Sequence, residues 1–225
     1  MGLYRYVRGG IDSTRDKIYY EVKRCLEINP WYAENVIFLA DNKASEQFLN
    51  DLGLDVTMTF TDAPQKVLLN KAHFMKYWMC IWALEQHGAF LWLDWDTIAM
   101  KKPDDAFWAY CSEGNTPKFI FIPHYHSLVC CGVYYANKAW FSRMKSQLFR
   151  NTIVEPPSDE LLWKLILPPN LDGLATFWWG SKVLNVWETV QHELVKRETY
   201  FLHVRDLDVS WNWLQANINS LNWTF

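Results

Sequence analysis

Residues 88–98 read Gly-Ala-Phe-Leu-Trp-Leu-Asp-Trp-Asp-Thr-Ile, an apolar run that ends in two aspartates. The continuous bulky residues at 89–93 predict a strand that is buried on both faces. A long amphipathic pattern from about residue 66 to 86 predicts a helix in front of this strand, and Gly88 ends it. The stretch therefore predicts a helix and a buried strand, with Asp94 and Asp96 at the carboxyl end of the strand.

The same alternation of helix and strand fills the sequence before this stretch. Strands are predicted at residues 3–7, 36–40 and 54–60, and helices at 14–27 and 44–52. Repeated strand–helix–strand units predict an α/β fold whose mostly parallel central sheet has helices on both faces. Ligands of such sheets bind beyond the carboxyl ends of the strands, so we expect Arg8–Gly10, Asp41–Asn42 and Asp94–Asp96 at one rim.

The second half of the sequence is less regular, and we expect mixed structure there. Strands are predicted at residues 119–122, 129–136 and 200–204, and helices at 138–149 and 159–165. The length of 225 residues fits a single domain.

Composition narrows the classes of function. The net charge of −3 gives no general electrostatic attraction to nucleic acid or to a membrane surface. No apolar run is long enough to span a bilayer, and no signal peptide is evident. The five cysteines are odd in number and lack the spacing of a disulfide framework. We therefore expect a cytoplasmic or otherwise soluble protein with reduced thiols and no nucleic-acid partner.

The two aspartates point to a metal site. On an extended chain, side chains two residues apart face the same way, which puts the carboxylates of Asp94 and Asp96 on one side. Carboxylate oxygens suit Mg²⁺ or Mn²⁺, and such an ion can neutralise a departing diphosphate. The alternative is a pair of solvated loop aspartates.

Three stretches resemble the DXD glycosyltransferases of the GT-A fold. They are residues 70–77 followed by 88–98, residues 131–137 (Cys-Gly-Val-Tyr-Tyr-Ala-Asn) with Trp140, and His203 after Tyr200-Phe201-Leu202. The similarity is to transferases of cell-surface or capsid glycans, and it covers about residues 3–205. It implies a GT-A-like, Rossmann-type sheet with a nucleotide-sugar-binding half at 1–100 and an acceptor-binding half at 101–225. It also implies that His203 is a third metal ligand.

The resemblance suggests further residues for the nucleotide sugar. Arg8 and Gly9 could contact the diphosphate or the base, although a plain turn is equally compatible. Asp41 lies where such enzymes bind the base or ribose, although it could simply cap a helix. Lys71 and Lys76 are five residues apart, so one could reach the donor while the other is solvated. Trp95, between the aspartates, completes this donor-binding set.

Asp159 is the candidate catalytic base. Inversion at the anomeric carbon needs a carboxylate close to the acceptor hydroxyl, and GT-A enzymes often place it at the start of a helix after the acceptor strand. The alternative is that Asp159 stabilises the helix dipole behind a Ser158 cap. Asp172 and Asp208 are other candidates, and a retaining enzyme needs no base there.

The predicted function is transfer of a sugar from a UDP- or GDP-sugar to a hydroxyl of a glycan or glycoprotein, with Mn²⁺ or Mg²⁺ as cofactor. A nucleotidyltransferase is one alternative, because it also combines an α/β sheet with metal-binding carboxylates. A non-catalytic carbohydrate-binding module that uses some of the 14 tryptophans is another.

Overall fold

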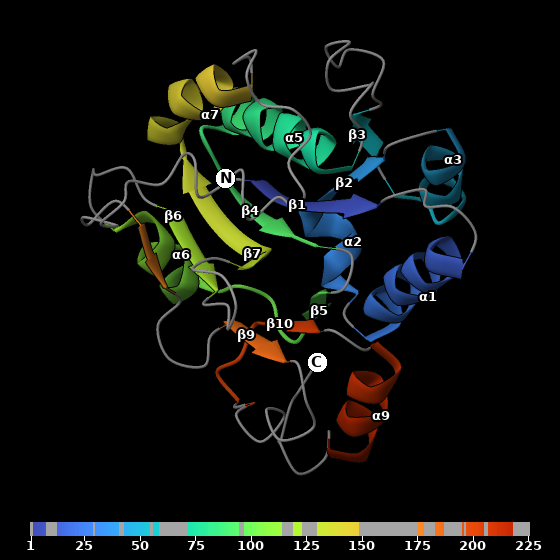
Figure 1. Cartoon of the computed structure of the whole chain (residues 1–225). Helices are drawn as coiled ribbons and strands as arrows, with labels where there is room; N and C mark the ends of the chain where they lie inside the picture. Colours follow the sequence, from blue (N-terminus) through green and yellow to red (C-terminus); the bar gives the residue numbers. More distant parts are fainter. Residues whose placement is uncertain are drawn as a thin grey trace.

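The computed structural model shows two β-sheets with helices packed around them (Figure 1). It describes residues 2–7, 13–28, 30–40, 43–54, 56–58, 72–94, 97–113, 119–122, 130–148, 175–177, 183–186, 195, 197–204 and 207–217. Among them, no helix has the length and apolar character that crossing a membrane requires.

The larger sheet has seven strands in the order β3-β2-β1-β4-β7-β6-β8. Their bounds are β1 (Gly2–Val7), β2 (Val36–Ala40), β3 (Val56–Met58), β4 (Ala89–Leu93), β6 (Phe119–Ile122), β7 (Cys130–Asn137) and β8 (Ala175–Phe177). Strands β1 to β4 run parallel, whereas β7 is antiparallel to both β4 and β6. The predicted mostly parallel sheet with a mixed second half is therefore confirmed.

The smaller sheet has the order β5-β10-β9 and joins distant parts of the sequence. It consists of β5 (Thr97–Ala99), β9 (Val183–Val186) and β10 (Phe201–Val204). Strand β5 directly follows the acidic segment at the end of β4, and it pairs antiparallel with β10. A late segment of the chain is thereby brought beside Asp94, which neither strand's own sequence indicates.

Helices cover both faces of the larger sheet. They are α1 (Ser13–Ile28), α2 (Trp31–Asn35), α3 (Lys43–Asp51), α5 (Ala72–His87), α6 (Asp105–Ser112), the 3₁₀ helix η2 (Lys138–Trp140), α7 (Phe141–Leu148) and α9 (Leu207–Asn217). Figure 1 shows α5 and α7 together on one face, with α1, α2 and the smaller sheet on the other. The predicted helix at 138–149 begins as the 3₁₀ helix η2, and α2, α6 and α9 were not predicted.

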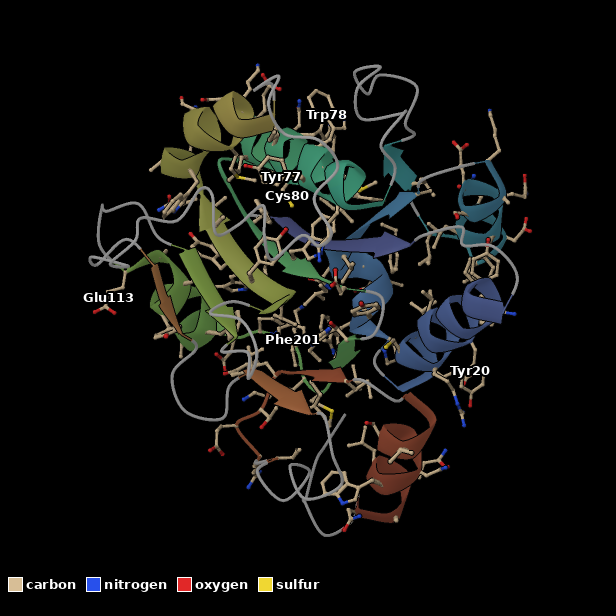
Figure 2. The ribbon with its side chains drawn as sticks, in the orientation of Figure 1. Tyr20, Tyr77, Trp78, Cys80, Glu113 and Phe201 are labelled. Carbon is tan, nitrogen blue, oxygen red and sulfur yellow. The ribbon has the colours of Figure 1, made fainter. Side chains whose placement is uncertain are left out.

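Strand β4 is buried on both faces, as its continuous apolar run predicts. Leu91 and Leu93 belong to the core that α1, α2, α6 and the smaller sheet build below the large sheet. Trp92 instead faces α5. The ammonium of Lys76 on that helix lies over its ring. Figure 2 shows Cys80 between α5 and the sheet, and Phe201 on the opposite side of the sheet. We call the face of the large sheet that packs against α5 the α5 face, and the opposite face the lower face.

Helix α5 ends through a glycine that adopts a left-handed backbone conformation. Gly88 has φ = 72°, and its N–H donates to the carbonyl of Leu84 at 2.9 Å. Such a residue terminates a helix and redirects the chain, at little cost only when it lacks a Cβ. Strand β4 begins at the next residue, so this turn sets where Asp94 falls at the end of the strand.

Candidate functional site

The parallel strands end together at one rim of the large sheet. Val7 at the end of β1 pairs with Ala40 at the end of β2, and Arg5 pairs with Leu93 at the end of β4. The predicted common rim is therefore confirmed for these strand ends. Arg8, Gly9 and Asp41 follow two of the strands in sequence but lie outside the described residues.

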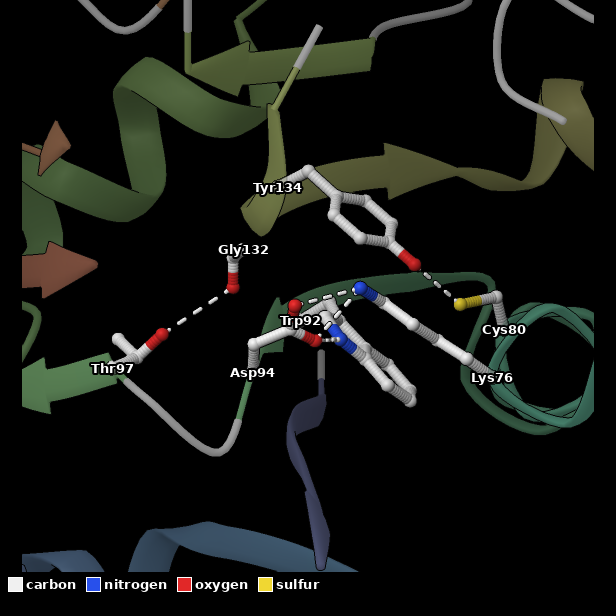
Figure 3. A network of polar contacts seen from close by, with 7 residues as sticks. All are labelled: Lys76, Cys80, Trp92, Asp94, Thr97, Gly132 and Tyr134. Atoms are coloured by element: carbon white, nitrogen blue, oxygen red, sulfur yellow. Dashed lines mark hydrogen bonds and ion pairs between the residues drawn. The ribbon is translucent and has the colours of Figure 1, made fainter. Parts of the chain in front are cut away.

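The carboxylate of Asp94 forms the centre of a polar network on the α5 face (Figure 3). The ammonium of Lys76 lies 2.7 Å from Oδ1 and donates to Oδ2 at 2.8 Å. The indole N–H of Trp92 donates to Oδ1 at 2.8 Å. The side chains of Lys76 and Asp94 are 8% and 20% exposed, so solvent screens this pair much less than a surface ion pair. Charge-assisted hydrogen bonds of this kind fix the orientation of the carboxylate.

Two aromatic rings flank the stem of Lys76. Trp92 and Tyr134 are directly opposite each other on β4 and β7, and their rings stack at 6.1 Å between centroids. The ammonium of Lys76 lies 5.9 Å from the centroid of each ring. The hydroxyl of Tyr134 lies 2.6 Å from the sulfur of Cys80, one helical turn after Lys76 on α5. The two rings and the Asp94 carboxylate therefore surround the ammonium of Lys76, which favours one position of it.

A backbone hydrogen bond links Asp94 to the first residue of β5. Strand β4 ends at Leu93, and the N–H of Thr97 donates to the carbonyl of Asp94 at 3.1 Å. This hydrogen bond ties the start of β5 to Asp94. The expectation that the carboxylates of Asp94 and Asp96 share one side stays a prediction. Asp96 itself lies outside the described residues.

His203 is brought beside this turn by the smaller sheet. It lies on β10 directly opposite Thr97 of β5, and its side chain is half-buried. The backbone pairing thus places His203 near the acidic segment, and its role as a third metal ligand stays a prediction. This contact between residues far apart in sequence depends on the ladder between β5 and β10.

Gly132 on β7 lies between these two groups. Its carbonyl accepts the Asp94 N–H at 2.7 Å and the Thr97 hydroxyl at 3.4 Å. On its other side, a Cβ atom would overlap the imidazole of His203 at Cγ, Cδ2 and Nε2. The histidine ring thus rests directly on the backbone of β7, in space that only glycine leaves open.

The start of β10 is anchored next to the site. The Met100 N–H donates to the Tyr200 carbonyl at 2.7 Å, and the Tyr200 hydroxyl donates to Asp104 at 2.8 Å. Asp104 also caps α6 by accepting the N–H of Phe107 at 2.9 Å. Burial, with the hydrogen bond to Asp104, raises the pKa of Tyr200 above its usual value of 10.0. The phenol therefore stays a neutral donor, and β10 is tied to the segment after β5.

Comparisons with known proteins agree with this architecture. No family model and no curated protein matches the sequence. Among solved structures, the chain is similar to a glycosyltransferase involved in glycosylation of the major capsid of PBCV-1, with a TM-score of 0.56 and 16% identity over 96% of this chain and 100% of that one. It is similar to the galactosyltransferase LgtC in complex with donor and acceptor sugar analogues, with a TM-score of 0.53 and 12% identity over 100% and 98% of the two chains. It is also similar to mouse xyloside xylosyltransferase 1, with a TM-score of 0.56 and 9% identity over 90% and 96%.

The chain has the GT-A fold of glycosyltransferases. The fold class implied by the sequence resemblance is thereby confirmed, and the structural relatives share nearly their full length with this chain. Identity of 16% or less shows a common fold and leaves the roles of single residues to be argued from this chain.

Two predicted metal ligands of this GT-A chain are among the described residues, namely Asp94 and His203. A carboxylate and an imidazole form a mixed oxygen and nitrogen donor set, which fits a divalent transition metal such as Mn²⁺. The described part of the chain contains no group of three histidine, cysteine or acidic side chains arranged to hold a metal. Asp96, the third predicted ligand, lies outside that part.

The other predicted site residues have different outcomes. Lys76 is buried and forms an ion pair with Asp94, so it lies beside a predicted metal ligand; its contact with the donor remains a prediction. Lys71, Trp95 and Asp159 lie outside the described residues and remain predictions.

Sequence reasoning missed the partners that position Asp94 and His203. Trp92 was assigned only to the strand, although its place two residues before Asp94 on the same face could have indicated the hydrogen bond. Gly132 within a strand is a signal of close approach by another group. The contact between Cys80 and Tyr134 carried no sequence signal, because it depends on how α5 is rotated against the sheet.

Proposed function

We propose that this chain is a metal-dependent glycosyltransferase that moves a sugar from a nucleoside-diphosphate sugar to a hydroxyl group of a glycan or glycoprotein. One observation carries the proposal. At the rim where the parallel strands of a GT-A fold end, the β5–β10 ladder pairs His203 with Thr97, immediately beyond the acidic segment that begins at Asp94. Ligand sites of open α/β sheets lie at this rim.

Asp94, Asp96 and His203 would hold the cation, with Mn²⁺ favoured over Mg²⁺ because the set includes an imidazole. When bound, such an ion supplies Lewis-acid stabilisation of the negative charge on a departing nucleoside diphosphate. Lys76 forms an ion pair with Asp94, so a bound cation would compete with the lysine for this carboxylate.

The remaining predicted residues would surround the donor and the acceptor. Arg8 and Gly9 follow β1, and Asp41 follows β2, so their sequence positions fit contacts to a UDP or GDP moiety at the common rim. Lys71 and Trp95 would complete the donor site. Asp159 would accept the proton of the acceptor hydroxyl if the reaction inverts the anomeric centre. The structural neighbour LgtC was captured with donor and acceptor sugar analogues, which supports testing both kinds of ligand.

Product analysis tests the proposal. The purified chain is incubated with a panel of UDP- and GDP-sugars and glycan acceptors, with and without Mn²⁺, and nucleoside diphosphate and pyrophosphate are both measured. We expect metal-dependent release of nucleoside diphosphate together with a glycosylated acceptor. Release of pyrophosphate in a parallel assay with UTP or GTP and a sugar 1-phosphate would instead establish a nucleotidyltransferase. Glycan binding without turnover of any donor would favour the carbohydrate-binding module.

A matched pair of aspartate variants links the activity to the site. Asp94→Asn keeps the shape of the side chain but removes its charge, so turnover should fall by at least about 100-fold. Asp105→Asn makes the same chemical change at an exposed position of α6 and should leave turnover unchanged. Equal activity in the two variants would contradict the assigned role of Asp94.

A further inference from the structure

We propose that Gly132 is a positioning residue that sets the imidazole of His203 relative to Asp94, and so determines cation affinity without touching the cation. The inference rests on the proposed function, because it assigns His203 as a ligand. It concerns a residue that the sequence analysis placed only within the stretch 131–137 that resembles DXD glycosyltransferases.

The geometry around Gly132 supports a dual contact. Its carbonyl holds the backbone N–H of Asp94 at 2.7 Å, at the point where β4 ends. Its Cα carries no side chain where the His203 ring packs, and a methyl group there would overlap three ring atoms. Both predicted ligands, Asp94 and His203, therefore contact the same residue of β7.

The backbone of His203 cannot easily move to make room for a methyl group at position 132. Its own strand is paired on both sides, with Thr97 of β5 and with Asn185 of β9. The flanking residues Leu202 and Val204 are fully buried, which opposes a shift of β10 as a whole. A side chain at position 132 must therefore rotate the imidazole away from β7 or separate β10 from β7.

The first test measures steric coupling in the absence of metal. Melting temperatures are determined in EDTA for the wild type, Gly132→Ala, His203→Ala and the double variant. Gly132→Ala alone should lower the melting temperature by about 5 °C because it overpacks a filled site. In the His203→Ala background the same change should cost less than about a third of that, because the imidazole is gone. Additive losses would overturn the inference, since they would show that Gly132 does not act through His203.

The second test measures Mn²⁺ affinity by titration calorimetry in the presence of UDP or GDP. Gly132→Ala should weaken Mn²⁺ binding about 10- to 100-fold, which is the usual effect of changing a residue that orients a metal ligand. The double variant should bind no more weakly than His203→Ala. Thr97→Val serves as the matched control. It removes the hydroxyl that donates to the Gly132 carbonyl without adding volume against the ring, so affinity should stay within about threefold.

The outcomes separate the two proposals. Unchanged Mn²⁺ affinity in Gly132→Ala, beside tight binding in the wild type, would overturn the role of Gly132 and leave the proposed metal dependence intact. Absence of binding in the wild type would overturn the proposed metal site itself, and with it the assignment of His203 as a ligand.

Discussion

The two faces of the large sheet at β4 and β7 differ in what fixes their side chains. On the α5 face, Lys76, Trp92 and Asp94 are joined by charge and hydrogen bonds. On the lower face, Leu93 and its neighbours fill a mainly apolar core against the smaller sheet and α1, α2 and α6. The first arrangement is sensitive to a change of charge at constant volume, and the second is sensitive to a change of volume alone.

Leu93→Ala gives the largest expected loss of stability. Leu93 is fully buried on the lower face, so truncation leaves a cavity and should lower the free energy of unfolding by about 3 kcal/mol. Urea denaturation measures this. Because the contacts of Asp94 are on the other face, the variant should retain Mn²⁺ affinity at temperatures where it is folded. A loss of affinity as large as that of Asp94→Asn would show that the two faces are not separable.

Lys76→Met removes charge on the α5 face while nearly keeping the volume. The ion pair is largely buried, so the change leaves Asp94 without its main partner and should cost about 2 kcal/mol of unfolding free energy. Mn²⁺ should bind at least as tightly as in the wild type, because a competing positive charge is removed. Weaker Mn²⁺ binding would contradict the assignment of Lys76 as the charge that balances Asp94.

Lys101→Met is the matched control for Lys76→Met. Lys101 also lies over an aromatic ring, 3.9 Å from the centroid of Tyr200, and near a carboxylate, with Nζ 3.9 Å from Asp104. Its side chain is 35% exposed, so the loss of stability should stay below about 1 kcal/mol. Equal losses in the two lysine variants would mean that burial does not decide the strength of these contacts.

Tyr134→Phe tests a neutral contact on the same α5 face. It removes the hydroxyl that meets the sulfur of Cys80 and keeps the ring that stacks on Trp92. The expected loss in unfolding free energy is about 1 kcal/mol, measured by urea denaturation. A loss exceeding that of Lys76→Met would reverse the order of charged and neutral contacts on this face.

Tyr135→Phe has the smallest expected effect, and it tests the lower face through the pH dependence of the unfolding free energy. Burial raises the pKa of Tyr135 to about 12 from an ordinary value of 10.0. The neutral phenol is therefore favoured in the folded state, and its contribution is fully present below pH 10 and is lost as the pH rises from 10 to 12. Unfolding free energies at pH 8 and pH 11 should fall less in Tyr135→Phe than in the wild type. If the unfolding free energy falls equally in both proteins, Tyr135 does not contribute to the loss of stability at alkaline pH.

The sequence predicted the large sheet well because each of its central strands carries a local signal. The apolar runs at Val36–Ala40, Ala89–Leu93 and Phe119–Ile122 became strands with the predicted bounds. Strand β5 was missed because its three residues follow the acidic segment directly and are stabilised by β10, about a hundred residues later. Helix α9 was missed because its many asparagine and tryptophan residues have only a modest intrinsic helix preference.

The candidate site was predicted in part. Asp94 could be placed from its position at the end of a buried strand, and His203 only from family resemblance. The pair of Lys76 with Asp94 and the packing of His203 on Gly132 depend on the rotation of α5 and the approach of β10 to β7. Such contacts are set by tertiary packing, which local sequence patterns do not encode.

The most direct measurement is an anomalous-scattering map of manganese from crystals grown with Mn²⁺ and UDP or GDP. The expected result is one manganese peak within coordination distance of the Asp94 carboxylate and the His203 imidazole, next to the nucleotide diphosphate. A crystal with the nucleotide bound, but with no peak at these side chains and with the Asp94 carboxylate still paired with Lys76 and Trp92, would contradict the metal-dependent transferase.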